Sequence, residues 1–176
     1  LTLPCHNPMA TFPAKFVFGA ASSSYQIEGG WNAADKGPCN WDHYAHHTTP
    51  AGTLAGALGP VITPGNVYMG HTGDVACDHY SRVVEDVSLM SQMSLQAYRF
   101  SLSWARIMPE GTGKVSSAGL AFYDKLVDSL LAAKITPWVT LFHWDLPLAL
   151  WHKGAWHNRD IVHAFADYTR VVVDHL

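Results

Sequence analysis

Three short apolar runs alternate along the chain with three longer stretches in which apolar residues recur every three or four positions. The short runs, which predict strands, are residues 16–21, 97–104 and 136–144. The longer stretches, which predict helices, are residues 74–93, 116–133 and 158–176. Because strands and helices alternate, we expect parallel strands joined by helical crossovers, that is, an α/β fold.

The helix starts and one long loop have signals of their own. Ser116 or Ser117 stands where an N-cap is expected, and Asp74 and Asp78 lie near the start of the first predicted helix, where the helix dipole favours acids. Residues 31–73 are rich in Gly, Pro, Thr and His and show no sustained period. A loop of this length inside a compact chain is usually functional.

Polar and aromatic side chains stand at the carboxyl end of each predicted strand. They are residues 25–28 (Tyr-Gln-Ile-Glu), Ser103 with Trp104, and residues 143–145 (His-Trp-Asp). Pro147 follows the last group and cannot donate to a sheet ladder. In a (β/α) barrel the active site is built at this end of the strands. The sequence therefore predicts a functional site where the three segments meet.

Composition excludes several classes of protein. The chain has 176 residues, of which 48% are hydrophobic and 14% charged, so it can form one domain with a core and is too apolar to be disordered. The net charge of −3 argues against nucleic acid or an anionic membrane as a partner. No apolar run approaches the roughly 20 residues that a membrane helix needs. Residues 1–6 lack the pattern of a signal peptide, and the sequence assigns no compartment.

Cysteines and clustered histidines are the candidates for metal binding. The chain has three cysteines, Cys5, Cys39 and Cys77. Their odd number and wide spacing match neither a disulfide framework nor a zinc motif, so reduced, buried thiols are expected. His43, His46 and His47 have a spacing that could place three imidazoles on one helix face. No cysteine or acidic ligand follows at a zinc-like interval, and we expect no metal site.

Three segments together resemble glycoside hydrolase family 1, which contains the retaining β-glucosidases. They are FVFGAASSSYQIEGG, DVACDHYSRVVEDVSLM followed by YRFSLSWARIMPEG, and TPWVTLFHWDLPLAL, in this order from about Phe12 to the end of the chain. The resemblance implies a partial (β/α)8 TIM barrel that contains the first three βα units. Residues 1–176 would be the N-terminal part of a single TIM-barrel domain, with residues 1–11 as an irregular leader.

The resemblance also implies a role for each residue that matches the family's motifs. Gln26, in SYQIEG, would hydrogen-bond hydroxyls on the far side of the sugar whose bond is cleaved, because an amide both donates and accepts. His143, in FHWDLP, would bind a neighbouring hydroxyl, and Trp144 would line the same pocket. Arg99, in YRFS, would lie beneath the site and keep a nucleophilic carboxylate ionised and oriented.

Neither catalytic carboxylate of the family is present in these 176 residues. A retaining glycosidase needs two carboxylates about 5–5.5 Å apart. The family carries them in an Asn-Glu-Pro motif and a Glu-Asn-Gly motif, and this sequence contains neither motif. Glu28 and Asp145 are not expected to replace them, since Asp145 precedes Leu146-Pro147, where a carboxylate often caps a turn. The resemblance thus implies sugar-binding residues in a chain that is inactive alone.

Two interpretations stay open. In the first, the chain is the N-terminal portion of a retaining β-glycosidase that cleaves β-linked glucosides or galactosides without a metal or organic cofactor. In the second, it is a catalytically inactive partial barrel that binds sugar or pairs with another chain. In both, the isolated chain has open sheet edges and an inner face that exposes Phe18, Phe100, Leu102, Leu141 or their neighbours. We therefore expect self-association or pairing with the remaining half of a barrel.

Overall fold

The computed structural model describes residues 12–47 and 66–176 of the chain. The strands and helices alternate in the predicted order, with several short helices added. In chain order the elements are β1 (Gly19–Ala21), α1 (Ser24–Ile27), α2 (Asn40–His46), the 3-10 helix η2 (Tyr68–Gly70), α3 (His79–Gln92), β2 (Ala97–Ser101), α4 (Trp104–Ile107), α5 (Ser117–Ala132), β3 (Thr136–Thr140), α6 (Leu148–His152), the 3-10 helix η3 (Ala155–His157) and α7 (Ile161–His175).

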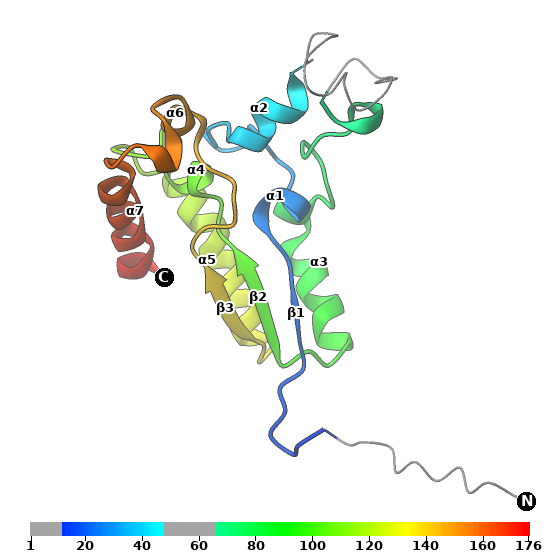
Figure 1. Cartoon of the computed structure of the whole chain (residues 1–176). Helices are drawn as coiled ribbons and strands as arrows, with labels where there is room; N and C mark the ends of the chain where they lie inside the picture. The colour runs from blue at the N-terminus through cyan, green and yellow to red at the C-terminus, as the bar shows by residue number, and fades with distance from the viewer. Residues whose placement is uncertain (1–11, 48–65) are drawn as a thin grey trace, which may run out of the picture.

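The three strands form one parallel sheet in the order β1-β2-β3 (Figure 1). In the register of this sheet, Arg99 lies between Ala21 on one side and Trp138 on the other. β1 and β2 approach each other closely at Gly19, where a Cβ atom would lie 2.7 Å from the carbonyl oxygen of Ala97. The predicted α/β class with parallel strands and helical crossovers is confirmed.

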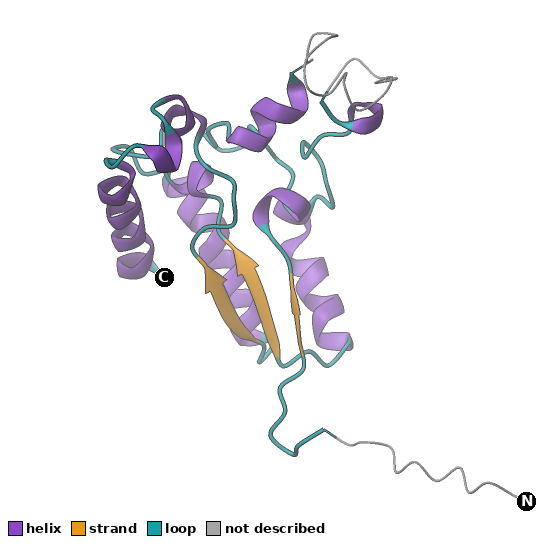
Figure 2. Ribbon diagram, viewed as in Figure 1, coloured by secondary structure: helices purple, strands orange, loops and turns teal. Residues whose placement is uncertain are grey.

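The hydrophobic core lies between the sheet and the helices behind it (Figure 2). Tyr98, Phe100 and Leu102 are buried, and they belong to one cluster with Val83 of α3 and Leu126 of α5. The expectation that Phe100 and Leu102 face the inside of a barrel is therefore wrong. Side chains alternate across a strand, so Tyr98 and Phe100 face the helices, whereas Ala97 and Arg99 face the open side.

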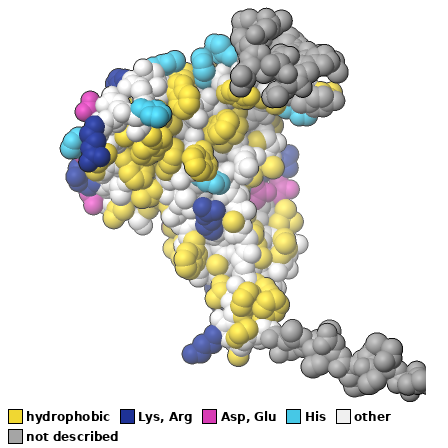
Figure 3. All heavy atoms as spheres, in the orientation of Figure 1, with side chains coloured by type: hydrophobic (Ala, Val, Ile, Leu, Met, Phe, Trp, Pro, Cys, Tyr) yellow, Lys and Arg dark blue, Asp and Glu magenta, His cyan; other side chains and the backbone are white. Residues whose placement is uncertain are grey.

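The opposite face of the sheet carries no helix in the described part of the chain (Figure 1). It forms an open hollow of about 390 Å³, lined by Arg99 and Trp138 together with the small residues Gly19, Ala97 and Thr136. Figure 3 shows hydrophobic side chains scattered over this side of the molecule. Trp138 is 63% exposed, so the surface that would face the interior of a barrel includes a large apolar side chain.

Each predicted strand is shorter in the structure than in the sequence analysis. β1 begins only at Gly19. The Phe18 carbonyl still accepts from the Gln96 amide at 2.9 Å, and the rings of Phe12, Phe16 and Phe18 pack together as an exposed aromatic cluster. β2 ends at Ser101 because the chain turns into α4, whose first residue, Trp104, is fully buried. β3 ends at residue 140, four residues before the predicted end.

The helices differ from the predictions mainly at their starts. α3 begins at His79 rather than at residue 74, and α7 begins at Ile161 rather than at residue 158. Ser116 is confirmed as the N-cap of α5, since its hydroxyl accepts a hydrogen bond of 3.0 Å from the Gly119 amide. Helix α2 lies inside the segment that was predicted to be loop.

No described helix is both long and apolar enough to span a lipid bilayer.

Candidate active site

The segments that follow the three strands meet at one end of the sheet (Figure 1). Helix α1 follows β1, helix α4 follows β2, and residues 141–147 follow β3. Hydrogen bonds join these segments directly, from Ser24 to Ser101 at the end of β2 and from Ser24 to Asp145 after β3. The sequence prediction that the three strand ends meet is confirmed.

Gln26 is an exposed residue of α1, near the carboxyl end of β1. The hydroxyl of Ser23 donates a hydrogen bond of 2.7 Å to Oε1 of Gln26. This contact occupies the acceptor end of the carboxamide and leaves its NH2 group as a free donor among the described contacts. Gln26 is thus held by its own helical turn while facing outward.

An aromatic hollow of about 380 Å³ lies beside Gln26. Its lining includes Tyr25, Trp41 and Tyr44, and the Tyr25 hydroxyl donates to the Trp41 carbonyl at 3.2 Å. Burial and the charge of Asp42 raise the pKa of Tyr25 to about 12, so its hydroxyl stays protonated at neutral pH. Flat aromatic faces with polar edges suit the apolar faces of sugar rings.

His143 and Trp144 follow β3 in adjacent positions but differ in exposure. His143 is half-buried, and its Nδ1 atom is buried with no hydrogen-bond partner among the described residues. Trp144 is 69% exposed and has a backbone φ of 81°. A residue other than glycine in this left-handed region costs about 1–3 kcal/mol. The backbone at Trp144 therefore turns sharply between a half-buried histidine and a buried aspartate.

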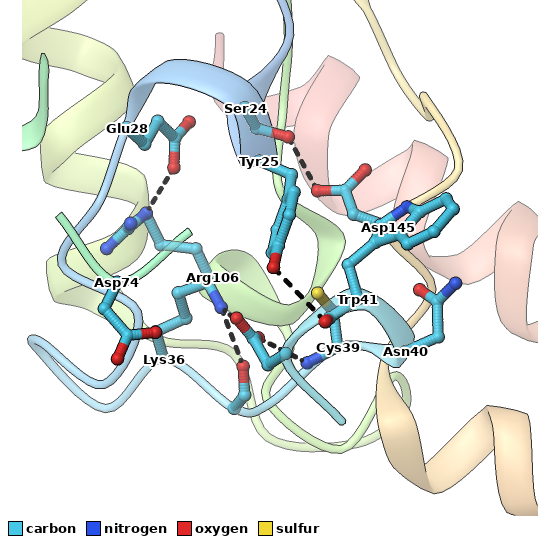
Figure 4. Close-up of polar contacts among 12 residues, drawn as sticks. Ser24, Tyr25, Glu28, Lys36, Cys39, Asn40, Trp41, Asp74, Arg106 and Asp145 are labelled. Atoms are coloured by element: carbon cyan, nitrogen blue, oxygen red, sulfur yellow. Dashed lines mark hydrogen bonds and ion pairs between the residues drawn. The ribbon is translucent and has the colours of Figure 1, made fainter. Parts of the chain in front are cut away.

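Asp145 is 1% exposed and is hydrogen-bonded across the site (Figure 4). Its Oδ2 atom accepts a hydrogen bond of 2.6 Å from the Ser24 hydroxyl, whereas Oδ1 is buried with no partner in the described chain. Burial raises the pKa of Asp145 to about 7; the Ser24 hydrogen bond opposes this effect and the charge of Glu28 adds to it. At neutral pH this carboxyl group is divided between its protonated and ionised forms.

Glu28 belongs to a buried ion pair (Figure 4). Its Oε2 atom accepts from Nε of Arg106 at 2.9 Å, and its Oε1 atom accepts from the Tyr123 hydroxyl at 2.7 Å. Arg106 also donates to the carbonyl of Gly29 and stacks over the Tyr80 ring, 4.4 Å from its centroid. Both oxygens of Glu28 are thus engaged in contacts that join the loop after β1 to α4 and α5.

Arg99 lies apart from these buried groups, on the open face of β2. Its Nε atom donates a hydrogen bond of 2.8 Å to the hydroxyl of Thr140 on β3. Because the side chain is exposed and has no acidic partner among the described contacts, its other donors face the hollow. An anionic group placed above the sheet would find a fixed cation there.

The thiols and histidines are dispersed. Cys39 is buried, and burial followed by the charge of Asp42 raises the pKa of its thiol to about 12. Cys77 is exposed, so the expectation of buried thiols is wrong for this residue, and residue 5 lies outside the described part. His46 pairs with Asp74 at 2.7 Å, whereas the rings of His43 and His47 lie 3.9 Å apart and are tilted by 40° to each other. Within the described residues, no group of three or more His, Cys, Asp or Glu could hold a metal ion.

Comparison with known proteins assigns the family. The family model described as "Glycosyl hydrolase family 1" matches residues 8–176, and the chain belongs to this family. Beta-glucosidase A of Acetivibrio thermocellus is 46% identical over 166 residues, which are 94% of this chain and 34% of that protein. A 1,4-beta-D-glucan glucohydrolase of Thermotoga neapolitana is 48% identical over 166 residues, with 94% and 35% covered.

Solved structures agree with this assignment. A beta-glucosidase from Thermotoga maritima in complex with castanospermine superposes with a TM-score of 0.82 at 47% identity, over 94% of this chain and 34% of that one. The chain therefore spans about a third of the length of the relatives it matches. The fold is that of a partial TIM barrel, since three parallel strands with crossover helices match the family barrel over this length.

Proposed function

We propose that this chain is the sugar-binding portion of a retaining β-glycosidase that hydrolyses O-glycosyl bonds. The observation that carries the proposal is that the segment after β1, which carries Gln26, is joined to the segment after β3, which carries His143 and Trp144, by the hydrogen bond between Ser24 and Asp145. The relatives named beta-glucosidase support β-linked glucosides as the substrate class, with galactosides as the alternative.

Each of these side chains has a chemical role that suits a sugar ring. The carboxamide of Gln26 and the imidazole of His143 bind neighbouring hydroxyls of the sugar whose bond is cleaved. The exposed Trp144 provides a flat wall for the same pocket. Arg99 holds the nucleophilic carboxylate ionised from below, by way of the guanidinium donors that Thr140 leaves free. Contacts that strengthen at the oxocarbenium-like transition state raise the rate of the reaction.

The acid/base and nucleophile carboxylates lie outside these 176 residues in this proposal. Both oxygens of Glu28 are hydrogen-bonded, to Arg106 and Tyr123, and Asp145 is only 1% exposed, so neither carboxylate is accessible to attack a sugar. The chain alone is therefore inactive, and its open sheet face is the surface that the rest of the barrel covers. Without such a partner, the exposed sheet edges and Trp138 favour self-association.

The test first determines whether the reading frame continues downstream of this chain. The intact protein that the frame encodes is then assayed for hydrolysis of an aryl β-glucoside. Hydrolysis is expected, and Gln26→Ala and His143→Ala should each lower kcat/KM by about tenfold to a thousandfold, roughly 1.4–4 kcal/mol of transition-state binding. Ser129→Ala, an exposed change on α5, is the control. A frame that ends with this chain would favour the inactive partial barrel, and unchanged kinetics in both variants would refute the sugar-site assignment.

A further inference from the structure

The predicted sugar contacts come from two separate strand ends, so their relative position depends on what joins those ends. Gln26 stands on the turn after β1, whereas His143 and Trp144 stand on the segment after β3. Strand β2 lies between them in the sheet. A misplacement of about 1 Å in a catalytic constellation can cost a hundredfold in rate. The groups that fix this distance are therefore part of the site.

Ser24 is the residue through which all three strand ends are connected. Its hydroxyl donates to Asp145 Oδ2 at 2.6 Å, and its backbone amide donates to the Ser101 hydroxyl at 2.9 Å. The Ser101 hydroxyl in turn donates to the Ser24 hydroxyl at 3.3 Å. All three residues are nearly inaccessible to solvent, with exposed fractions of 1–2%. We call Ser24, Ser101 and Asp145 the clasp.

The clasp acts directly on the backbone that carries the predicted sugar-binding residues. Ser24 and Gln26 share one helical turn of four residues, and Ser23, which precedes that turn, holds the Gln26 carboxamide. On the other side, Asp145 is adjacent to Trp144, whose φ of 81° turns the chain between His143 and Asp145. A strained conformation of this kind persists only where the surrounding structure over-determines it.

A second anchor fixes the same segment from helix α2. The Leu146 amide donates to Asn40 Oδ1 at 2.7 Å, and the Asn40 amide donates to the Leu146 carbonyl at 2.9 Å. Asp145 and Leu146 both follow the Trp144 turn, and the Leu146 amide also lies 3.1 Å from the Trp144 carbonyl. The clasp therefore adds a hold on the residue next to the turn, one position closer to it than the anchor at Leu146.

Burying the Asp145 carboxyl group in the clasp costs free energy that a purely structural role would not require. Asp145 is buried without a cation among its hydrogen-bond partners, and one of its oxygens has no partner in the described chain. Apolar residues of similar size would be as stable or more stable at a position that only packs. A buried acid at the mouth of a candidate site is instead typical of groups that serve function.

We propose that the clasp positions Gln26 relative to His143 and Trp144, so that Ser24 and Asp145 are positioning residues for sugar hydrolysis although neither contacts the sugar. This inference rests on the proposed function for its kinetic consequence. The clasp acts by hydrogen-bond geometry, since the Asp145 oxygen must accept from Ser24. An amide oxygen at position 145 can therefore replace the carboxylate, whereas a methyl group cannot.

The kinetic test compares variants of the intact protein that carries this chain, on an aryl β-glucoside. Ser24→Ala and Asp145→Ala should each lower kcat/KM about tenfold, whereas Asp145→Asn should stay within about threefold of the wild type. The double variant Ser24→Ala/Asp145→Ala should lose less than the product of the two single losses, because both changes break one contact. Ser129→Ala and Asp124→Asn are matched surface controls. Full additivity, or equal losses in Asp145→Asn and Asp145→Ala, would overturn the proposal.

Hydrogen exchange tests the clasp independently of activity. In Ser24→Ala, amide exchange should rise about tenfold in the peptide that contains residues 143–145 as well as in residues 24–27, with α5 and α7 unchanged. An increase confined to residues 24–27 would refute the clasp, as would a uniform increase over the whole chain that Asp145→Asn reproduces. If the wild-type protein hydrolyses no β-glycoside, the proposed function fails while the exchange result still decides the clasp.

Discussion

Glu28 and Asp145 are two buried carboxylates that line the same small hollow, and the protein stabilises them in opposite ways. Glu28 has a guanidinium on one oxygen and a phenol on the other. Burial alone lowers the pKa of Arg106, but attraction to Glu28 and the hydroxyls of Tyr123 and Tyr80 together raise it. Glu28 thus has a hydrogen-bond partner on each oxygen, and one of these partners is a cation.

Asp145 has no cation among its described hydrogen-bond partners. A single serine hydroxyl satisfies one oxygen, and burial raises the pKa of the carboxyl group to about 7. The two residues also differ in what they join. Glu28 links the segment after β1 to helices α4 and α5, whereas Asp145 links the segment after β3 to Ser24. Glu28 has a cation within hydrogen-bond distance, whereas Asp145 has none among its described contacts.

The largest expected effect in this comparison comes from breaking the Glu28 ion pair. Glu28→Ala leaves Arg106 buried and without its counter-charge, which should lower the free energy of unfolding by about 3–5 kcal/mol. The measurement is denaturant or thermal unfolding of the intact protein. Glu85→Ala, which removes an exposed pair with Arg82, is the control and should cost less than about 1 kcal/mol. Similar losses in the two variants would mean that burial does not distinguish these pairs.

A double replacement tests whether the loss in Glu28→Ala comes from the unpaired charge of Arg106. Glu28→Gln together with Arg106→Met removes both charges and leaves no uncompensated ion, so it should cost less than Glu28→Ala alone. A larger loss in the double variant would show that packing of the Arg106 stem against Tyr80 and Phe122, rather than its charge, supports this region.

The sequence predicted the fold better than it predicted these buried contacts. The parallel order of strands and the helices α3, α5 and α7 follow from periodicity, which is a local signal. Helix α2 was missed because its seven residues lie in a segment rich in Gly, Pro, Thr and His. The face of β2 was assigned wrongly for Phe100 and Leu102, because period-2 alternation does not show which side the helices cover.

In the site, the sequence motifs named Gln26, His143, Trp144 and Arg99, and their roles stay predictions. The polar residues that hold the site together were missed because their partners are distant in the sequence. Ser24 bonds to a residue 121 positions away, and Glu28 bonds to residues 78 and 95 positions away. No local pattern encodes such pairs, so only the folded chain identifies the clasp and the Glu28 ion pair.

The next prediction concerns the pH dependence that Asp145 gives to stability. Its pKa is about 7 in the folded chain and near 3.8, the ordinary value for an aspartate, when unfolded, so the folded state binds more protons between these values. The stability contributed by Asp145 is therefore present below about pH 4 and is lost as the pH rises to about 7, by at most about 4 kcal/mol. Asp145→Asn should remove this part of the pH dependence.

The test measures the thermal midpoint of the intact protein and of Asp145→Asn from pH 4 to pH 8. The thermal midpoint of Asp145→Asn, relative to that of the wild type, should rise steadily across this range and become constant above about pH 7.5. Asp124→Asn, which changes an exposed carboxylate paired with His175, provides the control. Parallel curves for the wild type and Asp145→Asn would show that the carboxyl group is not perturbed by burial.

The smallest expected effect concerns an ion pair that is not buried. Lys114 and Asp35 form an ion pair at 3.5 Å with side chains that are 71% and 70% exposed, so water already solvates both charges. Lys114→Ala should change the free energy of unfolding by less than about 1 kcal/mol, and 1 M salt should remove what difference there is, because the Debye length then falls to about 3 Å. Unfolding curves at low and high salt measure this. A loss comparable to that of Glu28→Ala would mean that ion pairing itself stabilises this chain, and the contrast between the Glu28 and Asp145 regions could no longer be attributed to desolvation.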